Sequence, residues 1–263
     1  MHYKTIVLSD IHLGSNASKA KEALTFLKHH TCDTLILNGD IIDGWQLKRG
    51  AEWKKAHSNF FKKVLQMSVK DKTDIIYIRG NHDDFLDAVL PFKLGRFSIR
   101  KLYIHKGVQR NYLVTHGDMF DSITTKMRWL SKLGDVGYTL LLWINHQYNK
   151  KRISKGLPYD SISQRIKARV KSVVSYISDF EIELSKFARI KGCTGVICGH
   201  IHQPAQKIIN GVLYLNSGDW VESLTALVEH ADGNWEICYY HDWILQFETA
   251  QNQFVSASDL VLS

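Results

Sequence analysis

The stretch GVICGHIHQP, residues 195–204, joins a short apolar run to two histidines, His200 and His202. The run GVIC has the composition of a buried strand. Side chains of a strand alternate between its two faces, so residues two apart project to the same side. The two imidazoles are therefore either two ligands aimed at one point or two loop histidines that happen to lie close together. This stretch alone leaves both interpretations open.

Other apolar runs also end in polar residues. They read KTIVLSDIH (4–12), TLILNGD (34–40), DIIYIRGNHD (74–83) and NYLVTHGD (111–118). Their apolar parts are nearly continuous, which is typical of strands buried on both faces in a layered α/β protein. Helical patterns over 19–29 and 52–67 separate the early runs. The later runs GVLYLNSGD (211–219), LTALVEH (224–230) and WEICYY (235–240) follow each other closely and predict an antiparallel part of a sheet.

Length and composition indicate an ordinary globular chain. It has 263 residues, of which 44% are hydrophobic and 23% charged, and only three are prolines. With no low-complexity run or linker, we expect a single domain over residues 1–263. The net charge of +8 indicates an anionic partner, which could be nucleic acid, a phosphorylated substrate or an acidic membrane surface.

The cysteines and the apolar runs predict a cytoplasmic location. The four cysteines form no CxxC pair and are expected to be reduced thiols: Cys32, Cys193, Cys198 and Cys238. The N-terminal residues enter a strand pattern directly, which predicts that no signal peptide is present. The longest apolar run, YTLLLWI (138–144), is too short to cross a bilayer. Contact with a membrane surface remains compatible with these patterns.

Residues 122–187 interrupt the strand pattern and predict a helical insert. Apolar residues recur there every three to four positions, as in an amphipathic helix: Ile162, Ile166, Val170, Val173 and Ile177. Residues 122–175 contain eleven Lys and Arg against two acidic residues, so the positive charge of the chain is concentrated in this insert. The charge indicates either the solvated face of surface helices or a functional surface for an anionic group.

The polar ends of the strand runs supply the donors of a metal site: Asp10, His12, Asp40, Asn81, His116, His200 and His202. In an open α/β sheet, ligands gather beyond the carboxyl ends of the strands, where these motifs are expected to converge. The donors are too many for one tetrahedral ion and suit two adjacent divalent ions that share a carboxylate. Mixed nitrogen and oxygen donors favour Mn, Fe, Zn, Co or Ni over Ca. Two adjacent metal ions of this kind promote displacement reactions at phosphorus.

The ordered series D-x-H, G-D, G-N-H-D, H-G-D and G-H-x-H resembles the calcineurin-like metallophosphoesterases. The resemblance implies a four-layer αββα sandwich. It also implies that one metal is held by Asp10, His12 and His202, that the other is held by Asn81, His116 and His200, and that Asp40 bridges them. By the same resemblance, His82 would donate a hydrogen bond to the phosphate or the leaving oxygen, and Asp83 would orient His82.

Within this superfamily, GDIIDGW (39–45), NSGDWVES (216–223) and the basic insert are most similar to the UDP-2,3-diacylglucosamine diphosphatases of lipid A synthesis. That branch implies Mn²⁺-dependent cleavage to 2,3-diacylglucosamine 1-phosphate and UMP at the inner face of the cytoplasmic membrane. In the insert, acyl chains or the diphosphate would meet Trp129, Leu133, Lys150, Arg152, Arg165 and Arg169, unless these residues simply pack the insert onto the domain. One departure is His82, because well-known members of the branch carry arginine there.

Two other classes of function compete with this interpretation. A nuclease, phosphodiesterase or phosphatase of the same superfamily would act on a soluble substrate. A nuclease is expected to show a basic groove with stacking aromatics, whereas the aromatics of this insert lie in aliphatic runs, so nucleic acid is disfavoured. A non-catalytic protein-binding scaffold is expected to have lost ligands, but every expected position is filled. The sequence leaves the oligomeric state open.

Overall fold

The computed structural model describes residues 1–120 and 162–249, with side chains over 1–120 and 176–249. The chain divides into two compact units, Met1–Asp118 with Leu184–Ser263, and Met119–Glu183. Most of the expected insert over 122–187 falls in the second unit, and much of it lies outside the described residues, so the insert stays a prediction. No helix among the described residues combines the length and the apolar composition that a membrane crossing requires.

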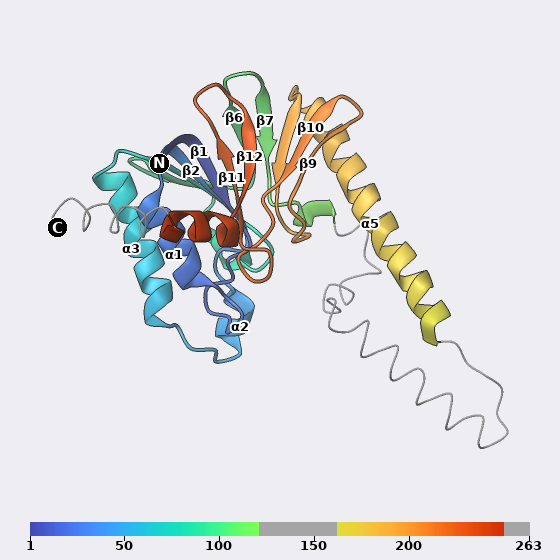
Figure 1. Cartoon of the computed structure of the whole chain (residues 1–263), viewed down its shortest axis with the longest axis horizontal. Coiled ribbons are helices and arrows are strands. Elements are labelled where there is room, and N and C mark those ends of the chain that lie inside the picture. The colour runs from blue at the N-terminus through green and yellow to red at the C-terminus, as the bar shows by residue number, and fades with distance from the viewer. Residues whose placement is uncertain (121–161, 250–263) are drawn as a thin grey trace, which may run out of the picture. The chain divides into compact units, whose positions relative to one another are not determined.

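The first unit contains a seven-stranded sheet (Figure 1). Its order is β12-β11-β1-β2-β3-β5-β4. Strands β1, β2, β3 and β5 pair in parallel, and the pairs toward both edges are antiparallel. The strand bounds are His2–Leu8 (β1), Thr31–Asn38 (β2), Asp74–Ile78 (β3), Phe92–Leu94 (β4), Phe97–Arg100 (β5), Thr225–Glu229 (β11) and Trp235–Tyr239 (β12).

A second sheet of five strands has the order β6-β7-β8-β10-β9. Its central pairs β7-β8 and β8-β10 are parallel, and both edge pairs are antiparallel. The bounds are Tyr103–Lys106 (β6), Asn111–Val114 (β7), Gly195–Cys198 (β8), Ala205–Ile209 (β9) and Val212–Asn216 (β10).

The sequence predicted that the last three strand runs form one antiparallel part of a sheet, and this prediction is wrong for the first of them. Strands β11 and β12 do pair as expected, but β10 belongs to the other sheet. The segment between Asn216 and Thr225 carries the chain from one sheet to the other. Buried runs of both sheets have the same apolar composition, so the pattern does not show which sheet a strand joins.

The helices confirm the two early helical patterns. They are α1 (Ala20–His29), the short α2 (Gly44–Lys48) and α3 (Lys55–Val69), with 3₁₀ turns η1 (Asp84–Val89) and η2 (Asp118–Phe120). The helix α5 (Ile162–Ile190) confirms the helix predicted from the apolar periodicity there. In its last turns, within the first unit, Leu184 and Ala188 are buried.

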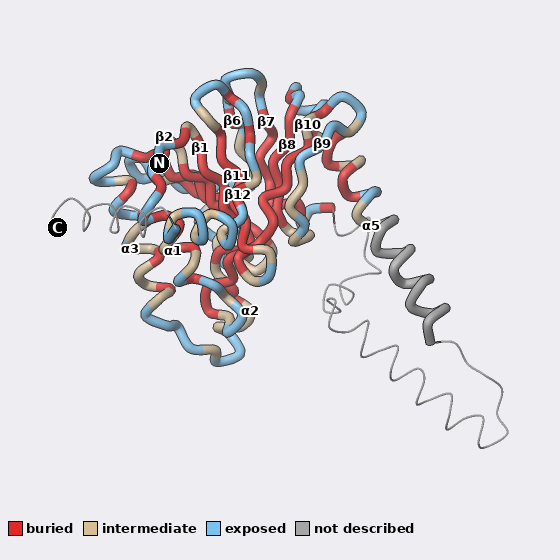
Figure 2. Tube along the Cα trace, viewed as in Figure 1, coloured by how far each residue is buried: buried red, intermediate tan, exposed pale blue. Residues whose placement is uncertain are grey.

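Two apolar cores lie on opposite faces of the seven-stranded sheet. One joins its strands to α1 and α3 through residues such as Ile6, Leu35, Phe26 and Phe60. The other lies between the sheets and contains Val7, Ile36 and Ile76 from the first and Val114, Ile197 and Leu215 from the second. Neighbouring residues of one strand thus enter different cores, which explains the nearly continuous apolar runs and the buried strands of Figure 2.

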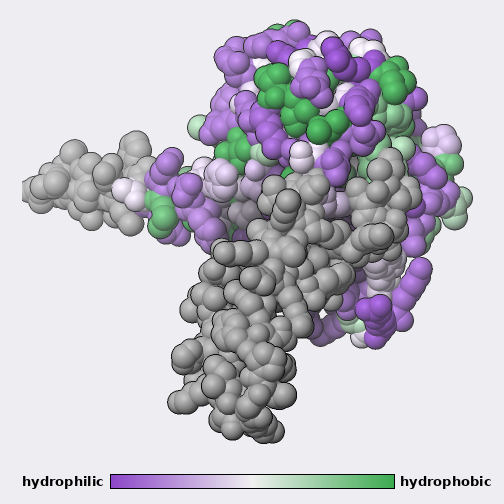
Figure 3. All heavy atoms as spheres, turned by 90° about the vertical axis from the view of Figure 1, so that its right-hand side faces the viewer, coloured by the Kyte–Doolittle hydropathy of each residue, from purple (hydrophilic) through white to green (hydrophobic). Residues whose placement is uncertain are grey.

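This is a mixed α/β fold with two packed sheets and helices, consistent with the predicted metallophosphoesterase sandwich. All four cysteines are buried free thiols, as predicted. Hydrophilic residues dominate the described part of the face shown in Figure 3, with hydrophobic side chains in smaller groups among them. Scattered exposed apolar residues of this kind are ordinary on a protein surface.

Candidate metal centre

All five polar motifs follow the carboxyl ends of strands, as predicted. Strands β1, β2 and β3 of the first sheet are followed by Asp10 and His12, by Asp40, and by Asn81. Strands β7 and β8 of the second sheet are followed by His116 and by His200 and His202. Seven candidate ligands therefore reach one region from both sheets.

The backbone of these loops is strained at five candidate ligands. The φ angles are positive at Asp10 (51°), His12 (51°), Asp40 (50°), His200 (68°) and His202 (54°). Side chains with a Cβ disfavour this left-handed region by about 1–2 kcal/mol per residue, and aspartate and histidine enter it more often than most. Strain gathered at one set of polar residues is characteristic of a functional site.

Glycines allow these loops to approach one another closely. A Cβ on Gly80 would overlap the carboxylate of Asp40. A Cβ on Gly199 would lie 2.5 Å from Oδ2 of Asp10 and 2.7 Å from Oγ of Ser9. The glycines before Asn81 and His200 are thus required by close contact with neighbouring side chains.

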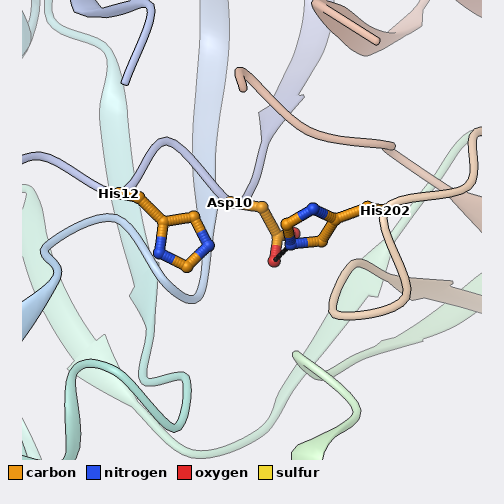
Figure 4. A group of neighbouring side chains, drawn as sticks. All are labelled: Asp10, His12 and His202. Carbon is orange, nitrogen blue, oxygen red and sulfur yellow. Dashed lines mark ion pairs between the residues drawn. The ribbon is translucent and has the colours of Figure 1, made fainter. Parts of the chain in front are cut away.

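The first group of candidate ligands is Asp10, His12 and His202, whose donor atoms all lie within 4.8 Å of one another. In Figure 4 the two imidazoles flank the carboxylate of Asp10, and Nε2 of His202 lies 3.1 Å from its Oδ1. Burial would lower the pKa of His202, but Asp10 raises it to about 9. Burial would likewise raise the pKa of Asp10, but His202 and His116 lower it. The carboxylate and the imidazole thus stabilise each other's charged forms.

The second group is Asp40, His116 and His200, again with donor atoms within 4.8 Å of one another. Nδ1 of His116 lies 3.0 Å from the carbonyl oxygen of Asn38, to which it donates if protonated there, leaving Nε2 as a lone-pair donor 3.3 Å from Oδ2 of Asp40. Burial lowers the pKa of His116, but the charges of Asp40 and Asp10 outweigh it and raise that pKa well above the usual value.

Asp40 belongs to the second group and also approaches the first. Its Oδ2 is 3.3 Å from Nε2 of His116 and 3.9 Å from Nε2 of His12, which belongs to the first group. Its Oδ1 accepts a hydrogen bond of 2.8 Å from the backbone N–H of His82. One carboxylate oxygen is therefore fixed by the backbone, while the other faces donors of both groups.

The donor set fits divalent cations. Four buried atoms of the expected ligands make no hydrogen bond among the described residues: Asp10 Oδ1, His12 Nε2, Asn81 Oδ1 and His116 Nε2. A buried polar atom without such a partner costs about 1–3 kcal/mol. Two divalent ions would complete the coordination of all four atoms, and imidazole with carboxylate and amide oxygen is a suitable set for Mn or Zn.

A third group contains Asp43, an acid that is not among the candidate residues predicted from the sequence. Asp43 lies with His12 and His82 in a cluster of donor atoms within 4.8 Å. Its Oδ1 is 3.0 Å from Nδ1 of His82 and also accepts from the backbone N–H of Gln46, capping α2. Its Oδ2 is 3.5 Å from Nδ1 of His12. In the sequence, Asp43 is recognisable only as an acidic residue before Gly44, which suits a helix cap and does not indicate a contact with a histidine.

The prediction that Asp83 orients His82 is wrong, because Asp43 occupies that place. The buried carboxylate of Asp83 instead accepts hydrogen bonds from the backbone N–H of Ile42 (2.8 Å) and from the hydroxyl of Tyr77 (2.8 Å). Burial and the nearby charge of Asp40 raise the pKa of Asp83 to about 7. Asp83 therefore fixes the loop that follows Asp40 rather than the imidazole of His82.

His82 stands at the accessible edge of this cluster. Burial would lower its pKa, but the hydrogen bond to Asp43 and the charges of Asp40 and Asp43 raise it above the usual value. The ring centroid of Trp45 lies 4.1 Å from that of His82. With Nδ1 held by Asp43, Nε2 is the nitrogen available for a phosphate or a leaving oxygen.

A family model described as calcineurin-like phosphoesterase matches residues 3–204. The chain belongs to the calcineurin-like phosphoesterase family. No curated protein matches it. The family depends on divalent metals, so this phosphoesterase is a metal-dependent hydrolase of phosphoesters, and the His and Asp groups described above could hold its ions.

Several solved structures resemble the phosphoesterase at low sequence identity. An archaeal phosphodiesterase is 14% identical with a TM-score of 0.44, and the match covers 89% of this chain and 98% of that one. A hypothetical protein from Pyrococcus horikoshii is 10% identical with a TM-score of 0.46, covering 94% of both chains. A Vps29 mutant from Entamoeba histolytica is 11% identical with a TM-score of 0.41, covering 89% and 96%. Likenesses this distant bear on neither substrate nor partner.

The predicted substrate contacts of the phosphoesterase lie outside the described residues or side chains. Trp129, Leu133, Lys150 and Arg152 fall within residues 121–161. Arg165 and Arg169 belong to α5, but their side chains are outside the described ones. Their contacts with substrate stay predictions.

Proposed function

We propose that the phosphoesterase holds two divalent ions side by side at the strand ends and hydrolyses a phosphoester or phosphoanhydride there. The observation that carries this proposal is the pair of ligand groups linked by Asp40, each with buried atoms that make no hydrogen bond among the described residues. One ion would be held by Asp10, His12 and His202. The other would be held by Asn81, His116 and His200, with Asp40 shared.

When bound, two such ions neutralise phosphate oxygens and lower the pKa of a water molecule between them. The chain itself supplies orientation and a proton. The bond between His116 and the carbonyl of Asn38 directs Nε2 toward Asp40. Asp43 holds His82 so that a protonated Nε2 can donate to a phosphate or leaving-group oxygen, which stabilises the negative charge developing there.

For the substrate, we propose UDP-2,3-diacylglucosamine, cleaved with Mn²⁺ to 2,3-diacylglucosamine 1-phosphate and UMP. Both segments that resemble that branch contribute to the site. Residues 39–45 include Asp40, Asp43 and Trp45, and in residues 216–223 the backbone N–H of Trp220 donates to the carbonyl of Asp10. The concentration of positive charge in residues 122–175 supports contact with a diphosphate and with an anionic membrane surface at its cytoplasmic face.

The ligand assignment is tested with the purified full-length chain. Asp40→Ala and His116→Ala should each abolish Mn²⁺-dependent hydrolysis of a generic phosphodiester while leaving the far-ultraviolet circular dichroism spectrum unchanged. Asp74→Ala is the matched control, since Asp74 is an exposed acid at the opposite end of β3, paired with Arg96. Metal-dependent activity retained by the purified Asp40 and His116 variants would refute the assignment.

The substrate assignment needs a separate comparison. UMP release from UDP-2,3-diacylglucosamine is measured beside release from a soluble UDP-sugar without acyl chains. A strong preference for the acylated substrate is expected. Equal or absent turnover of both, with generic phosphodiester cleavage intact, would keep the two-metal chemistry and remove the lipid assignment in favour of a soluble phosphodiester.

A further inference from the structure

Both candidate metal groups combine residues from the two sheets. In the first group, Asp10 and His12 follow β1 of the seven-stranded sheet, whereas His202 follows β8 of the five-stranded sheet. In the second, Asp40 follows β2, whereas His116 and His200 follow β7 and β8. The spacing of the two sheets at this edge therefore sets the distances among the ligands of either ion.

A pair of buried serines, one of them adjacent to Asp10, joins the two sheets. Ser9 precedes Asp10, Ser217 follows β10, and neither side chain is exposed to solvent. Their hydroxyl oxygens are 2.7 Å apart. The hydroxyl of Ser9 also reaches the carbonyl of Gly218 (2.9 Å), and that of Ser217 reaches the carbonyl of Cys198 (3.1 Å). The two hydroxyl groups thus make three contacts with only two protons between them, and neither serine is accessible to solvent.

The serine pair is continuous with the turn that carries His200 and His202. Asn216, also fully buried, donates from Nδ2 to the carbonyl of Gly199 (2.9 Å) and accepts at Oδ1 from the backbone N–H of Gly218 (2.9 Å). On the other side, Oδ2 of Asp10 accepts from the backbone N–H of His200 at 3.1 Å. This chain of contacts therefore runs from Ser9, next to Asp10, through Gly218 and Asn216 to Gly199, next to His200.

Resting on the proposed two-metal function, we infer that Ser9 and Ser217 are positioning residues. They set the distance between the ligands that follow strands of the seven-stranded sheet and those that follow strands of the five-stranded sheet. Neither hydroxyl is needed to join the sheets as such, because the apolar core between them does so. A second polar contact between the sheets, Glu229 of β11 with His105 of β6 at 2.8 Å, involves residues outside the candidate ligand set. The serine pair acts on the metal centre because it adjoins Asp10 and the turn after β8.

The test is metal binding by the full chain, measured as the number of ions bound at equilibrium and as the affinity for Mn²⁺ in a calorimetric titration. Ser217→Ala should bind at least one of the two ions about tenfold more weakly, as substitutions behind metal ligands typically do. Electron paramagnetic resonance gives a signature that a merely structural role would not change. The spectrum of two coupled Mn²⁺ ions in the wild type should become that of isolated Mn²⁺ in the variant.

Two further variants separate positioning from loss of stability. Thr73→Val removes a buried hydroxyl that donates to the carbonyl of Cys32 (2.8 Å) at the amino end of β3, away from the ligands, and should leave metal binding unchanged. Ser9→Ala removes the same contact from the side of the seven-stranded sheet and should weaken metal binding as Ser217→Ala does. It replaces Ser217→Ala in the test if the latter fails to fold. The double variant should lose little more affinity than either single variant.

The outcomes distinguish this inference from the proposed function. A wild type that binds two ions, together with Ser217→Ala and Ser9→Ala that bind them equally tightly with the coupled spectrum intact, overturns the serine inference alone. A wild type that binds no divalent ion overturns both. Weakened binding in Thr73→Val to the same extent would also overturn the inference, because any buried hydroxyl would then have the same effect.

Discussion

Replacing Asp43 by asparagine should slow hydrolysis without disturbing the fold. Asparagine has the same shape and is an equally good cap, so Oδ1 can still accept from the backbone N–H of Gln46 at the start of α2. The change removes the negative charge that faces Nδ1 of His82 at 3.0 Å and Nδ1 of His12 at 3.5 Å. Asp43→Asn therefore isolates the effect of the carboxylate on the two imidazoles.

The magnitude follows from the hydrogen bond that is weakened. A hydrogen bond to a charged group contributes about 1.5–3 kcal/mol, and each 1.4 kcal/mol is tenfold in rate, so kcat should fall by about 10- to 100-fold. The pH profile should move as well. Burial lowers the pKa of His82 and Asp43 opposes that effect, so the variant should lose the protonated imidazole at lower pH and its alkaline limb should shift downward.

The assay is Mn²⁺-dependent hydrolysis of a generic phosphodiester at saturating metal across a range of pH. Asp84→Asn is the matched control. Its carboxylate contacts Nε1 of Trp45 at 3.4 Å and Nζ of Lys48 at 3.8 Å and belongs to none of the ligand groups. An Asp43→Asn variant with unchanged kcat and an unshifted alkaline limb would refute the role of Asp43.

Three further outcomes are expected. Burial lowers the pKa of His30 to about 4, so the unfolded chain binds more protons between that value and about 6.5. Stability should therefore fall by about 2 kcal/mol from pH 7 to pH 5, and urea unfolding of His30→Gln should lack this part of the loss. Glu229→Gln should destabilise the fold by about 2 kcal/mol in urea, because its buried carboxylate accepts from Thr5 and pairs with His105. Chelation should lower the unfolding temperature, and Mn²⁺ at 1,000 times its Kd should restore about 4 kcal/mol per ion; an unchanged melting curve would contradict metal binding.

The positions of the candidate ligands at the ends of strands were predictable because their signal in the sequence is local. A buried strand is recognised from four or five consecutive residues, and the polar residue that follows it lies at the sheet edge wherever the strand pairs. Thus Asp10 and His116 could be placed at one edge although they come from different sheets.

Other features depend on contacts between distant segments. Asp43 reaches His82 across 39 residues, and Ser9 reaches Ser217 across 208 residues. An acid or a serine in a turn has many uses, and its neighbours in the sequence do not indicate which one applies. The contact of Asp43 with His82 is of this kind, and the resemblance that implied Asp83 in that role did not indicate it either.

Backbone hydrogen bonds that continue beyond the strands hold the strained loops of the candidate ligands in place. After β1 ends, the backbone N–H of Asp10 donates to the carbonyl of Gly39, and that of His12 donates to the carbonyl of Asp40. The loops after β1 and β2 are therefore held side by side by the same kind of bond that pairs their strands, although three of their non-glycine residues, Asp10, His12 and Asp40, have positive φ angles. Left-handed residues turn the chain sharply, and here they do so at three of the candidate ligands. The pairing of the strands and loops thus offsets the strain of the left-handed residues, and these residues fix the positions of the candidate ligands.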